Sequence, residues 1–194
     1  LVDKIAQTKN KNDKPFYSLN KIIAGQSHND KIKKIIKFLK KNNLDNIFIT
    51  APENVAWVLN IRGHDNPSSP IPNSNLIITK DNKKFIIANK NKLKKLIKEK
   101  RIDVKEIIEP KNIEFFLNKL NGKNILIDNK SCSIDYEQTL NKKLKVIKKT
   151  DPIYLLKSIK NKVEIKNMID AHIIDGVALT KFIYWIKEVN KKKI

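Results

Sequence analysis

Short apolar runs alternate with amphipathic segments through residues 27–150, and this alternation restricts the fold of the chain more than any other feature. Apolar runs bounded by polar turns are typical of buried strands, and apolar residues at every third or fourth position are typical of helices. A chain that alternates strands and helices builds an α/β domain whose mixed sheet is covered by helices on both faces. The expected strands are residues 47–50, 75–79, 85–88, 104–108, 124–128 and 144–148.

Helix caps and apolar spacing place the expected helices. Ser27 suits an N-cap, and the apolar residues at 32, 35, 36 and 39 form one stripe under a lysine-covered face, whose lysines we expect to be solvated. Pro52 suits the first turn of a short helix that ends at Leu59, because proline there costs no hydrogen bond. A polar turn at 80–83 joins two strands into a hairpin. Further helices are expected around 93–97, at 112–120 and at 134–141.

Three parts follow from this pattern. Residues 1–26 are polar, contain Pro15 and Gly25, and are expected to form a linker or wrapping arm. Residues 27–150 form the α/β domain. Pro152 marks the next junction, and residues 161–190 are expected to form one helix about 45 Å long at 1.5 Å per residue. We therefore expect residues 151–194 to lie outside the α/β domain.

The net charge of +21 does not by itself indicate a nucleic-acid-binding protein. Of the 41 basic residues only Arg62 and Arg101 are arginines, whereas proteins that recognise a base sequence use the planar guanidinium fork. Single-strand binders place aromatic rings along a basic groove, but the lysine-rich stretches 33–41 and 90–101 hold one aromatic residue, Phe38. We expect weak, salt-sensitive adsorption without sequence preference. A basic binding module for nucleic acid or a protein partner is the alternative function.

No local set of catalytic or metal-binding residues is visible. His28, His64 and His172 lie far apart and lack the spacing of a metalloprotease helix, and no glycine-rich phosphate loop can be written. Cys132 is the only cysteine, which excludes an intrachain disulfide and suits a reducing compartment. No apolar run approaches the length of a membrane span. We expect a cytoplasmic location, no membrane contact, and no catalytic residue, metal ligand or cofactor within this chain.

The turn formed by Arg62, Gly63, His64 and Asp65 is a candidate functional loop. Glycine permits a tight turn, and the Arg62 fork can bind a carboxylate or loop carbonyls, with Asp65 as a possible partner. Our first hypothesis is that the loop is a structural staple. The second is that it faces a substrate cleft or another domain.

The long helix at the end of the chain is a candidate interface. Ile165, Ile169 and Ile173 form one apolar line, and a second line contains Phe182 and Trp185. His172 and Asp175 are close enough to touch, and we expect a hydrogen bond there, not a metal site. We expect the helix to pack against the flank of its own domain or against the same helix of a second copy, which favours a homodimer.

Two segments resemble the two halves of one family pattern. The first runs from Phe48 to Asp65 and includes Trp57, Arg62 and Gly63. The second runs from Asp151 through residues 152–164 and continues through Met168, His172, Asp175-Gly176 and Phe182 to Trp185. In this order and separation they resemble the Xaa-Pro aminopeptidases (aminopeptidase P) of the creatinase and prolidase superfamily. Leu1–Ile5 is similar to the family's lead-in from the first domain to the second. Ser158 and Asn167 depart from the family's usual alanine and glycine.

The resemblance implies a three-domain enzyme that removes the N-terminal residue preceding proline and uses two divalent metal ions, usually manganese. It implies that this chain is a piece holding the second, creatinase N-terminal-like domain and the first helix of the pita-bread catalytic domain, and none of the metal ligands. The chain by itself is then expected to be inactive. Its expected partners are the remaining domains of the parent enzyme and, in that parent, a peptide with proline at the second position.

Overall fold

The computed structural model describes residues 14–191. Eight strands and eight α-helices are found in this part of the chain. The strands are β1 Tyr17–Ser18, β2 Asn46–Ile49, β3 Ile61–Arg62, β4 Asn75–Thr79, β5 Lys84–Ile87, β6 Ile107–Ile108, β7 Asn124–Ile127 and β8 Lys145–Lys148. The helices are α2 Lys21–Ala24, α3 His28–Lys41, α4 Pro52–Leu59, α5 Lys90–Lys98, α6 Ile113–Lys119, α7 Ile134–Asn141, α8 Pro152–Ser158 and α9 Lys162–Lys191, with two 3-10 turns, η1 Val104–Glu106 and η2 Pro110–Asn112.

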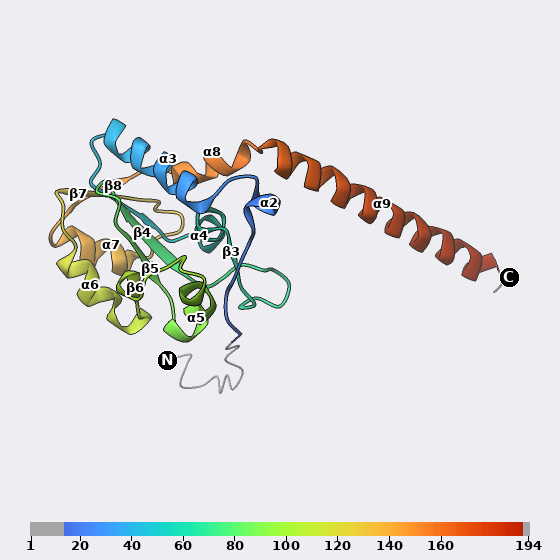
Figure 1. The fold of residues 1–194 in the computed structure, drawn as a ribbon, viewed down its shortest axis with the longest axis horizontal. Coiled ribbons are helices and arrows are strands. Elements are labelled where there is room, and N and C mark those ends of the chain that lie inside the picture. Colours follow the sequence, from blue (N-terminus) through green and yellow to red (C-terminus); the bar gives the residue numbers. More distant parts are fainter. Residues whose placement is uncertain (1–13, 192–194) are drawn as a thin grey trace.

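A six-stranded mixed sheet forms the centre of the α/β domain (Figure 1). Its strand order is β6-β5-β4-β2-β7-β8. β2, β7 and β8 are parallel, β4 is antiparallel to β2 and β5, and β6 is parallel to β5. The hairpin expected from the polar turn at 80–83 is therefore confirmed as β4 and β5.

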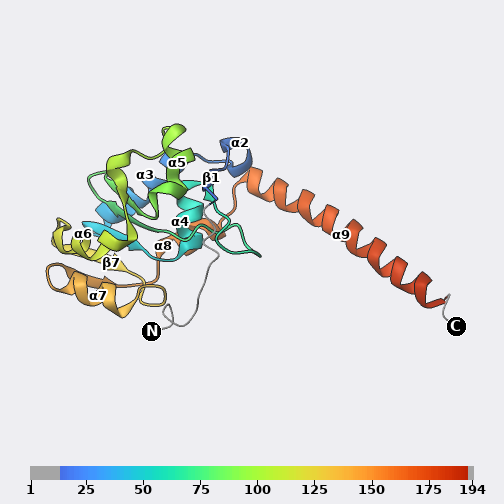
Figure 2. The same cartoon turned by 90° about the horizontal axis from the view of Figure 1, so that it is seen from below.

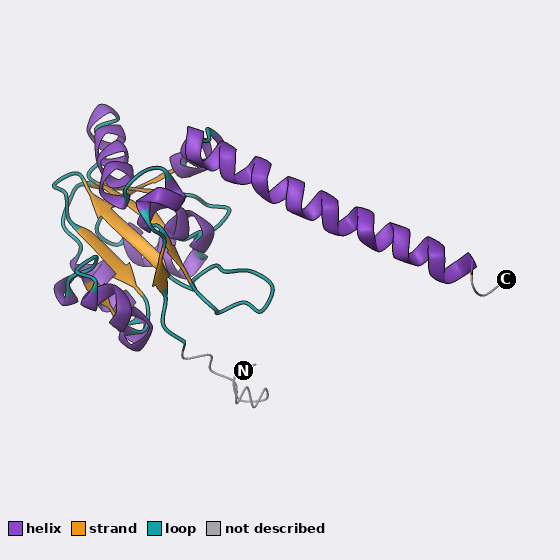
Figure 3. Ribbon diagram, turned by 45° about the vertical axis from the view of Figure 1, so that its right-hand side comes forward, coloured by secondary structure: helices purple, strands orange, loops and turns teal. Residues whose placement is uncertain are grey.

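Helices cover both faces of this sheet, as predicted (Figure 3). Because side chains alternate along a strand, Ile47 and Ile49 of β2 face one layer and Phe48 faces the other. The first layer is formed with apolar residues of α3, α4, α5 and α8, and the second with those of α6 and α7. The mixed α/β fold expected from the alternating pattern is confirmed.

Residues 14–26 pack onto the domain as a strap, a name used here for this range. Phe16 is fully buried in the first core layer, and its N–H donates to the carbonyl of Lys92. Tyr17 and Ser18 pair with Arg62 and Ile61, so β1 and β3 form a separate two-stranded sheet. The first 13 residues, including the Leu1–Ile5 lead-in, lie outside the described range. The strap thus connects α5, β3 and, through α2, the start of α9.

Helix α9 projects away from the α/β domain (Figures 1, 2 and 3). Its main contact with the rest of the described chain is with α2, at its own N-terminal end. Large apolar side chains from Ile165 to Ile186 stay exposed. The expectation that the helix packs along the flank of its own domain is therefore wrong, because the joint at residues 159–161 directs it outward.

Two details differ from the sequence-based expectation. Only Ile107 and Ile108 of the expected strand 104–108 pair as a strand. The residues before them form a 3-10 turn, Val104–Glu106, which Asp103 caps with its side chain while its N–H donates to the Glu106 carboxylate. The lysines of α3 are not all solvated either. Lys31 is 1% exposed and points into the domain.

Candidate functional site

The candidate loop, residues 60–73 and called here the Arg62 loop, is held close to the domain at its beginning. The Gly63 N–H donates to the Pro70 carbonyl at 3.0 Å. A Cβ atom at Gly63 would lie 2.8 Å from Cα of Pro72 and 3.1 Å from the Phe16 ring, so no larger residue fits without movement. The glycine is thus required by a close approach between loop and strap.

Arg62 and Asp65 do not pair, so the expected ion pair between them is wrong. Arg62 uses Nη1 to donate to the carbonyl oxygens of Ile61 at 2.8 Å and Ala56 at 3.4 Å. Asp65 instead forms an ion pair with Lys92 of α5 and accepts from the N–H of Asn73 at 2.6 Å. Each residue fastens the loop separately, Arg62 to the end of α4 and Asp65 to α5. The carbonyl partners considered for Arg62 are the ones it uses.

His64 lies at the exposed surface of the same loop. Its ring is 5.3 Å from the ring of Tyr17, measured between centroids, and tilted by 33°. Tyr17 belongs to the strap, so this contact adds to the β1–β3 pairing that holds loop and strap together. His64 is therefore the exposed residue among the four candidates of this loop.

A buried lysine that sequence reasoning missed lies behind the Arg62 loop. The Lys31 ammonium donates to the Trp57 carbonyl at 3.0 Å and to Asn60 Oδ1 at 2.8 Å, and lies 3.9 Å from the centre of the Trp57 ring. Burial lowers the pKa of Lys31 to about 8. Asn60 has a positive φ of 51° at the C-cap of α4, and its amide donates to the Gln26 carbonyl at 2.8 Å. Lys31 therefore fixes the point where the loop begins.

A second unpredicted polar cluster connects α8 to the domain. Asp151 is buried and accepts from Asn54 Nδ2 at 2.7 Å and from the Ile153 N–H at 2.9 Å. Lys157 donates to Asn54 Oδ1 at 2.6 Å, and the Asp151 N–H donates to Asp128 Oδ2 at 2.9 Å. Burial raises the pKa of Asp151. Because these groups satisfy one another, the cluster anchors α8 and leaves little bonding capacity for a ligand.

The candidates on α9 lie away from the Arg62 loop, so the structure does not bring the two groups together (Figure 1). The ring of His172 bonds through Nδ1 to the carbonyl oxygen of Met168 at 2.7 Å, not to Asp175 as expected. Phe182 and Trp185 are 54% and 59% exposed, with stacked rings 6.1 Å apart. Where α8 meets α9, an apolar groove of 620 Å³ is lined by Ser158, Lys160, Ile165, Met168, Ile169, His172 and Ile173. The described part of α9 thus presents an apolar, exposed surface beside this groove.

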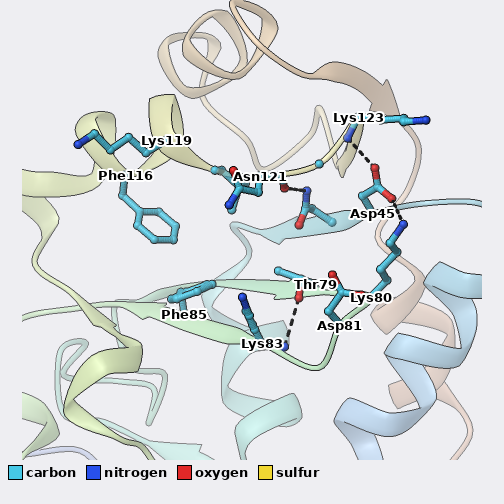
Figure 4. A pocket seen from close by; sticks show the side chains of 13 residues that line it. Asp45, Thr79, Lys80, Asp81, Lys83, Phe85, Phe116, Lys119, Asn121 and Lys123 are labelled. Atoms are coloured by element: carbon cyan, nitrogen blue, oxygen red, sulfur yellow. Dashed lines mark hydrogen bonds and ion pairs between the residues drawn. The ribbon is translucent and has the colours of Figure 1, made fainter.

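A cavity of 470 Å³ opens between the β4–β5 turn and the segment that leads from α6 to β7 (Figure 4). Phe85 and Phe116, with ring centroids 4.8 Å apart, form its apolar side. Lys80 is paired with Asp45 at 2.6 Å. The polar side chains of its lining are mainly lysines, aspartates and asparagines, and we assign no function to it.

The described residues do not fit a metal site. Within residues 14–191, no group of three or more histidine, cysteine, aspartate or glutamate side chains is placed to hold a metal ion. Cys132 is a free, half-buried thiol whose pKa burial raises to about 11, which disfavours the reactive thiolate. Among the described helices none is long and apolar enough to cross a membrane.

The comparison with protein families gives one match that spans most of the chain. Residues 7–164 match the model of the Creatinase/Prolidase N-terminal domain. Xaa-Pro aminopeptidase 1 of Dictyostelium discoideum is 31% identical over 197 residues, covering 97% of this chain and 31% of the relative. The Xaa-Pro aminopeptidase ApepP of Drosophila melanogaster is 32% identical over 191 residues, covering 92% of this chain and 31% of the relative. The chain thus spans about a third of the length of these relatives.

Solved structures confirm the fold. The X-prolyl aminopeptidase of Caenorhabditis elegans, described as a cytosolic enzyme with a di-nuclear active site, superposes with a TM-score of 0.79 at 18% identity. That match covers 96% of this chain and 32% of the enzyme. The Xaa-Pro dipeptidase of Bacillus anthracis has a TM-score of 0.54 at 15% identity, over 72% of this chain and 38% of that one.

Proposed function

The chain belongs to the Creatinase/Prolidase N-terminal domain family, and on this basis we propose that it is a non-catalytic part of a metal-dependent Xaa-Pro aminopeptidase. In this proposal the described residues up to about 150 form the domain that precedes the catalytic domain, and residues 151–194 begin the catalytic domain. The parent enzyme removes the N-terminal residue that precedes proline in a peptide. The names of the relatives and the share of their length that the chain spans support this assignment.

The exposed apolar surface of α9 carries the proposal. Twelve large apolar side chains between Ile165 and Ile186 are at least 38% exposed on one projecting helix. Burying one such side chain contributes roughly 1.5–3 kcal/mol, so a helix of this kind gains considerable stability from a cover. In this proposal the rest of the catalytic domain provides that cover. His172, Asp175, Phe182 and Trp185 then lie in or beside an interface between α9 and that domain.

The metal ions of the parent enzyme belong outside the described residues in this proposal. The Caenorhabditis elegans enzyme has a di-nuclear active site, whereas residues 14–191 offer no cluster of three suitable ligands. Two divalent ions, with manganese as the expected metal, would therefore be bound by the segment that follows α9. No step of the reaction is assigned to residues of this chain.

For the Arg62 loop we favour a structural role at a domain boundary. Arg62 and Asp65 are already engaged with α4 and α5, which supports the staple hypothesis. His64 remains at the surface, where a neighbouring domain of the parent can contact it. A cytoplasmic location is also part of the proposal, supported by the description of the Caenorhabditis elegans enzyme as cytosolic.

The test compares the 194-residue chain with a longer protein from the same reading frame that continues beyond α9. Both proteins are loaded with manganese, dialysed to remove free metal, analysed for bound metal and assayed with an Arg-Pro-Pro peptide. We expect chelator-sensitive release of the N-terminal arginine by the longer protein, and neither stoichiometric metal nor release by the chain. Chelator-sensitive turnover by the chain itself would overturn the proposal.

Two variants of the longer protein test the role of α9. Replacing Phe182 and Trp185 with aspartate places charges in the proposed interface, and we expect loss of activity. The control, Lys181→Asp, changes charge at an exposed neighbouring position of the same helix. Equal activities of the two variants would show that α9 does not contact the catalytic domain through these residues.

A further inference from the structure

Helix α9 leaves the domain through a joint made of α8, residues 159–161 and α2. Asn161 is the N-cap of α9, because its Oδ1 accepts from the N–H groups of Val163 at 2.9 Å and Glu164 at 3.0 Å. The Glu164 carboxylate accepts in return from the Asn161 N–H at 2.9 Å, which completes a capping box. The beginning of α9 is thus fixed locally, independently of the domain.

The other end of the Asn161 amide fixes the helix to the strap. Asn161 Nδ2 donates to the Ala24 carbonyl at 3.0 Å, and Asn167 Nδ2, two turns along α9 from the joint, donates to the Ile23 carbonyl at 3.0 Å. Both acceptors lie in the last turn of α2, where carbonyls have no partner within the helix. One amide holds the first turn of α9 and the other holds the second, so together they oppose rotation of α9 about its end.

The acceptors are themselves held in place. Asn20 caps α2 by accepting from the Ile22 N–H at 3.1 Å, and Gly25 ends α2 with a φ of 69°. A Cβ atom at Gly25 would lie 2.1 Å from Asn161 Oδ1. A larger residue there would therefore displace the Asn161 carboxamide from its position between α9 and α2. The next residue, Gln26, is tied through its carbonyl to Asn60.

Helix α8 is fixed from the opposite side. Two hydrogen bonds join α8 and its N-cap to Asn54 of α4. Asn54 donates to Asp151 at 2.7 Å and accepts from Lys157 at 2.6 Å. The Tyr154 hydroxyl adds a bond of 2.9 Å to Glu53, also on α4. Both segments that flank residues 159–161 are thus anchored on the α/β domain.

From this geometry we propose that two hydrogen bonds, donated to α2 by the side-chain amides of Asn161 and Asn167, hold α9 at one fixed angle to the α/β domain. Asn161 is the principal positioning residue. If α9 begins a catalytic domain, the same bonds set the orientation of that domain relative to the α/β domain. This consequence rests on the proposed function. The rigidity of the joint in the 194-residue chain is independent of the proposed function.

Replacing Asn161 with aspartate separates its two roles. A carboxylate still accepts from the N–H groups of Val163 and Glu164, so the helix stays capped. The donor to the Ala24 carbonyl is lost. Combined with Asn167→Ala, the change removes both hydrogen bonds from α9 to α2. Gly25→Ala tests the same joint by crowding Asn161, and Asn91→Asp on the exposed face of α5 is a control for the charge change.

The angle is measured by electron–electron double resonance between spin labels at Lys37→Cys on α3 and Lys181→Cys on α9, in a Cys132→Ser background. Each labelled protein is diluted with an excess of unlabelled chain, so that spin pairs between two copies do not contribute. We expect one narrow distance distribution for the background and for the Asn91→Asp control. For Asn161→Asp with Asn167→Ala, and for Gly25→Ala, we expect a broad distribution at unchanged helix content by circular dichroism. The fraction of molecules in which α9 has left its position on α2 should rise by up to about thirtyfold. This factor corresponds to the loss of two hydrogen bonds of about 1 kcal/mol each.

Two results would overturn the proposal. One is a broad distribution already in the background chain, and the other is a narrow, unshifted distribution in both altered proteins. Neither result depends on peptidase activity, so failure of the joint and failure of the proposed function can be told apart.

Discussion

The Lys31 ammonium lies 3.9 Å from the centre of the Trp57 ring and donates to the carbonyl oxygen of the same residue at 3.0 Å. Its third partner is Asn60 Oδ1 at 2.8 Å. All three partners are uncharged. Through them one buried lysine joins α3 to the end of α4, where the Arg62 loop begins and where the strap is tied by Asn60.

Replacing Lys31 with methionine should therefore destabilise the chain. Methionine can fill the space, but Asn60 Oδ1 loses its Lys31 donor, and the Trp57 carbonyl keeps only the N–H of Asn60 at 3.4 Å. An unsatisfied buried acceptor costs about 1–3 kcal/mol. Urea denaturation should show a loss in this range, whereas Lys33→Met on the exposed face of the same helix should change stability by no more than about 0.5 kcal/mol. Equal midpoints for the two variants would contradict this role of Lys31.

Lys31 should also make stability depend on pH in the alkaline range. Burial lowers its pKa to about 8 in the folded chain, from 10.5 in the unfolded chain. Between these two pKa values the unfolded state binds more protons than the folded state. The contribution of Lys31 to the free energy of unfolding therefore increases as the pH rises through this window. Lys31→Met lacks the group. The stability difference between parent and variant should widen from about pH 7 to about pH 10, and a constant or shrinking difference would be inconsistent with the lowered pKa.

Arg62→Ala separates the two hypotheses for the Arg62 loop. The guanidinium bonds the carbonyls of Ile61 and Ala56, so its removal should lower the stability of the longer peptidase by about 1–2 kcal/mol. We expect kcat/KM at a temperature well below Tm to change little. An unchanged Tm with a large loss of kcat/KM would instead place Arg62 at the substrate cleft. Asn66→Ala, at an exposed position of the same loop, is the matched control.

Without its cover, α9 should make the isolated chain associate with itself. Its exposed Phe182 and Trp185 side chains form part of a large apolar surface on one helix. Light scattering should show an average mass that rises with concentration for the 194-residue chain, but not for a version that ends at Ser158. A strictly monomeric chain at high concentration would rule out association through this helix.

The sequence predicts the α/β domain well because its elements are set by local patterns. Pro52 at the start of α4, Ser27 at the cap of α3 and the polar turn of the β4–β5 hairpin each act within a few residues. Where two local signals compete, the prediction is less accurate. Asp103 and Glu106 form a capping box inside the expected strand 104–108 and shorten it to two residues.

The candidate site is less predictable because its contacts join residues far apart in sequence. Asp65 bonds Lys92 rather than nearby Arg62, and no local pattern indicates that choice. Lys31 lies four residues before Ile35 and so on the same side of α3 as the apolar stripe, which is a signal for its burial, but composition alone favours a solvated lysine. Asn161 and Glu164 do show a capping pattern. The partnership of Asn161 with Ala24 depends on how α2 folds back.

We propose that α9 is one half of an interface that the rest of a peptidase completes. Hydrogen–deuterium exchange of the peptides that cover residues 165–186 tests it most directly, in the 194-residue chain and in a longer protein that continues beyond it. In the chain, kept at a concentration at which light scattering shows a monomer, α9 projects into solvent and should exchange quickly, whereas the buried β2 and β7 should exchange slowly. In the longer protein we predict strong protection of residues 165–186, with β2 and β7 unchanged. Equally fast exchange of these residues in both proteins would contradict the account.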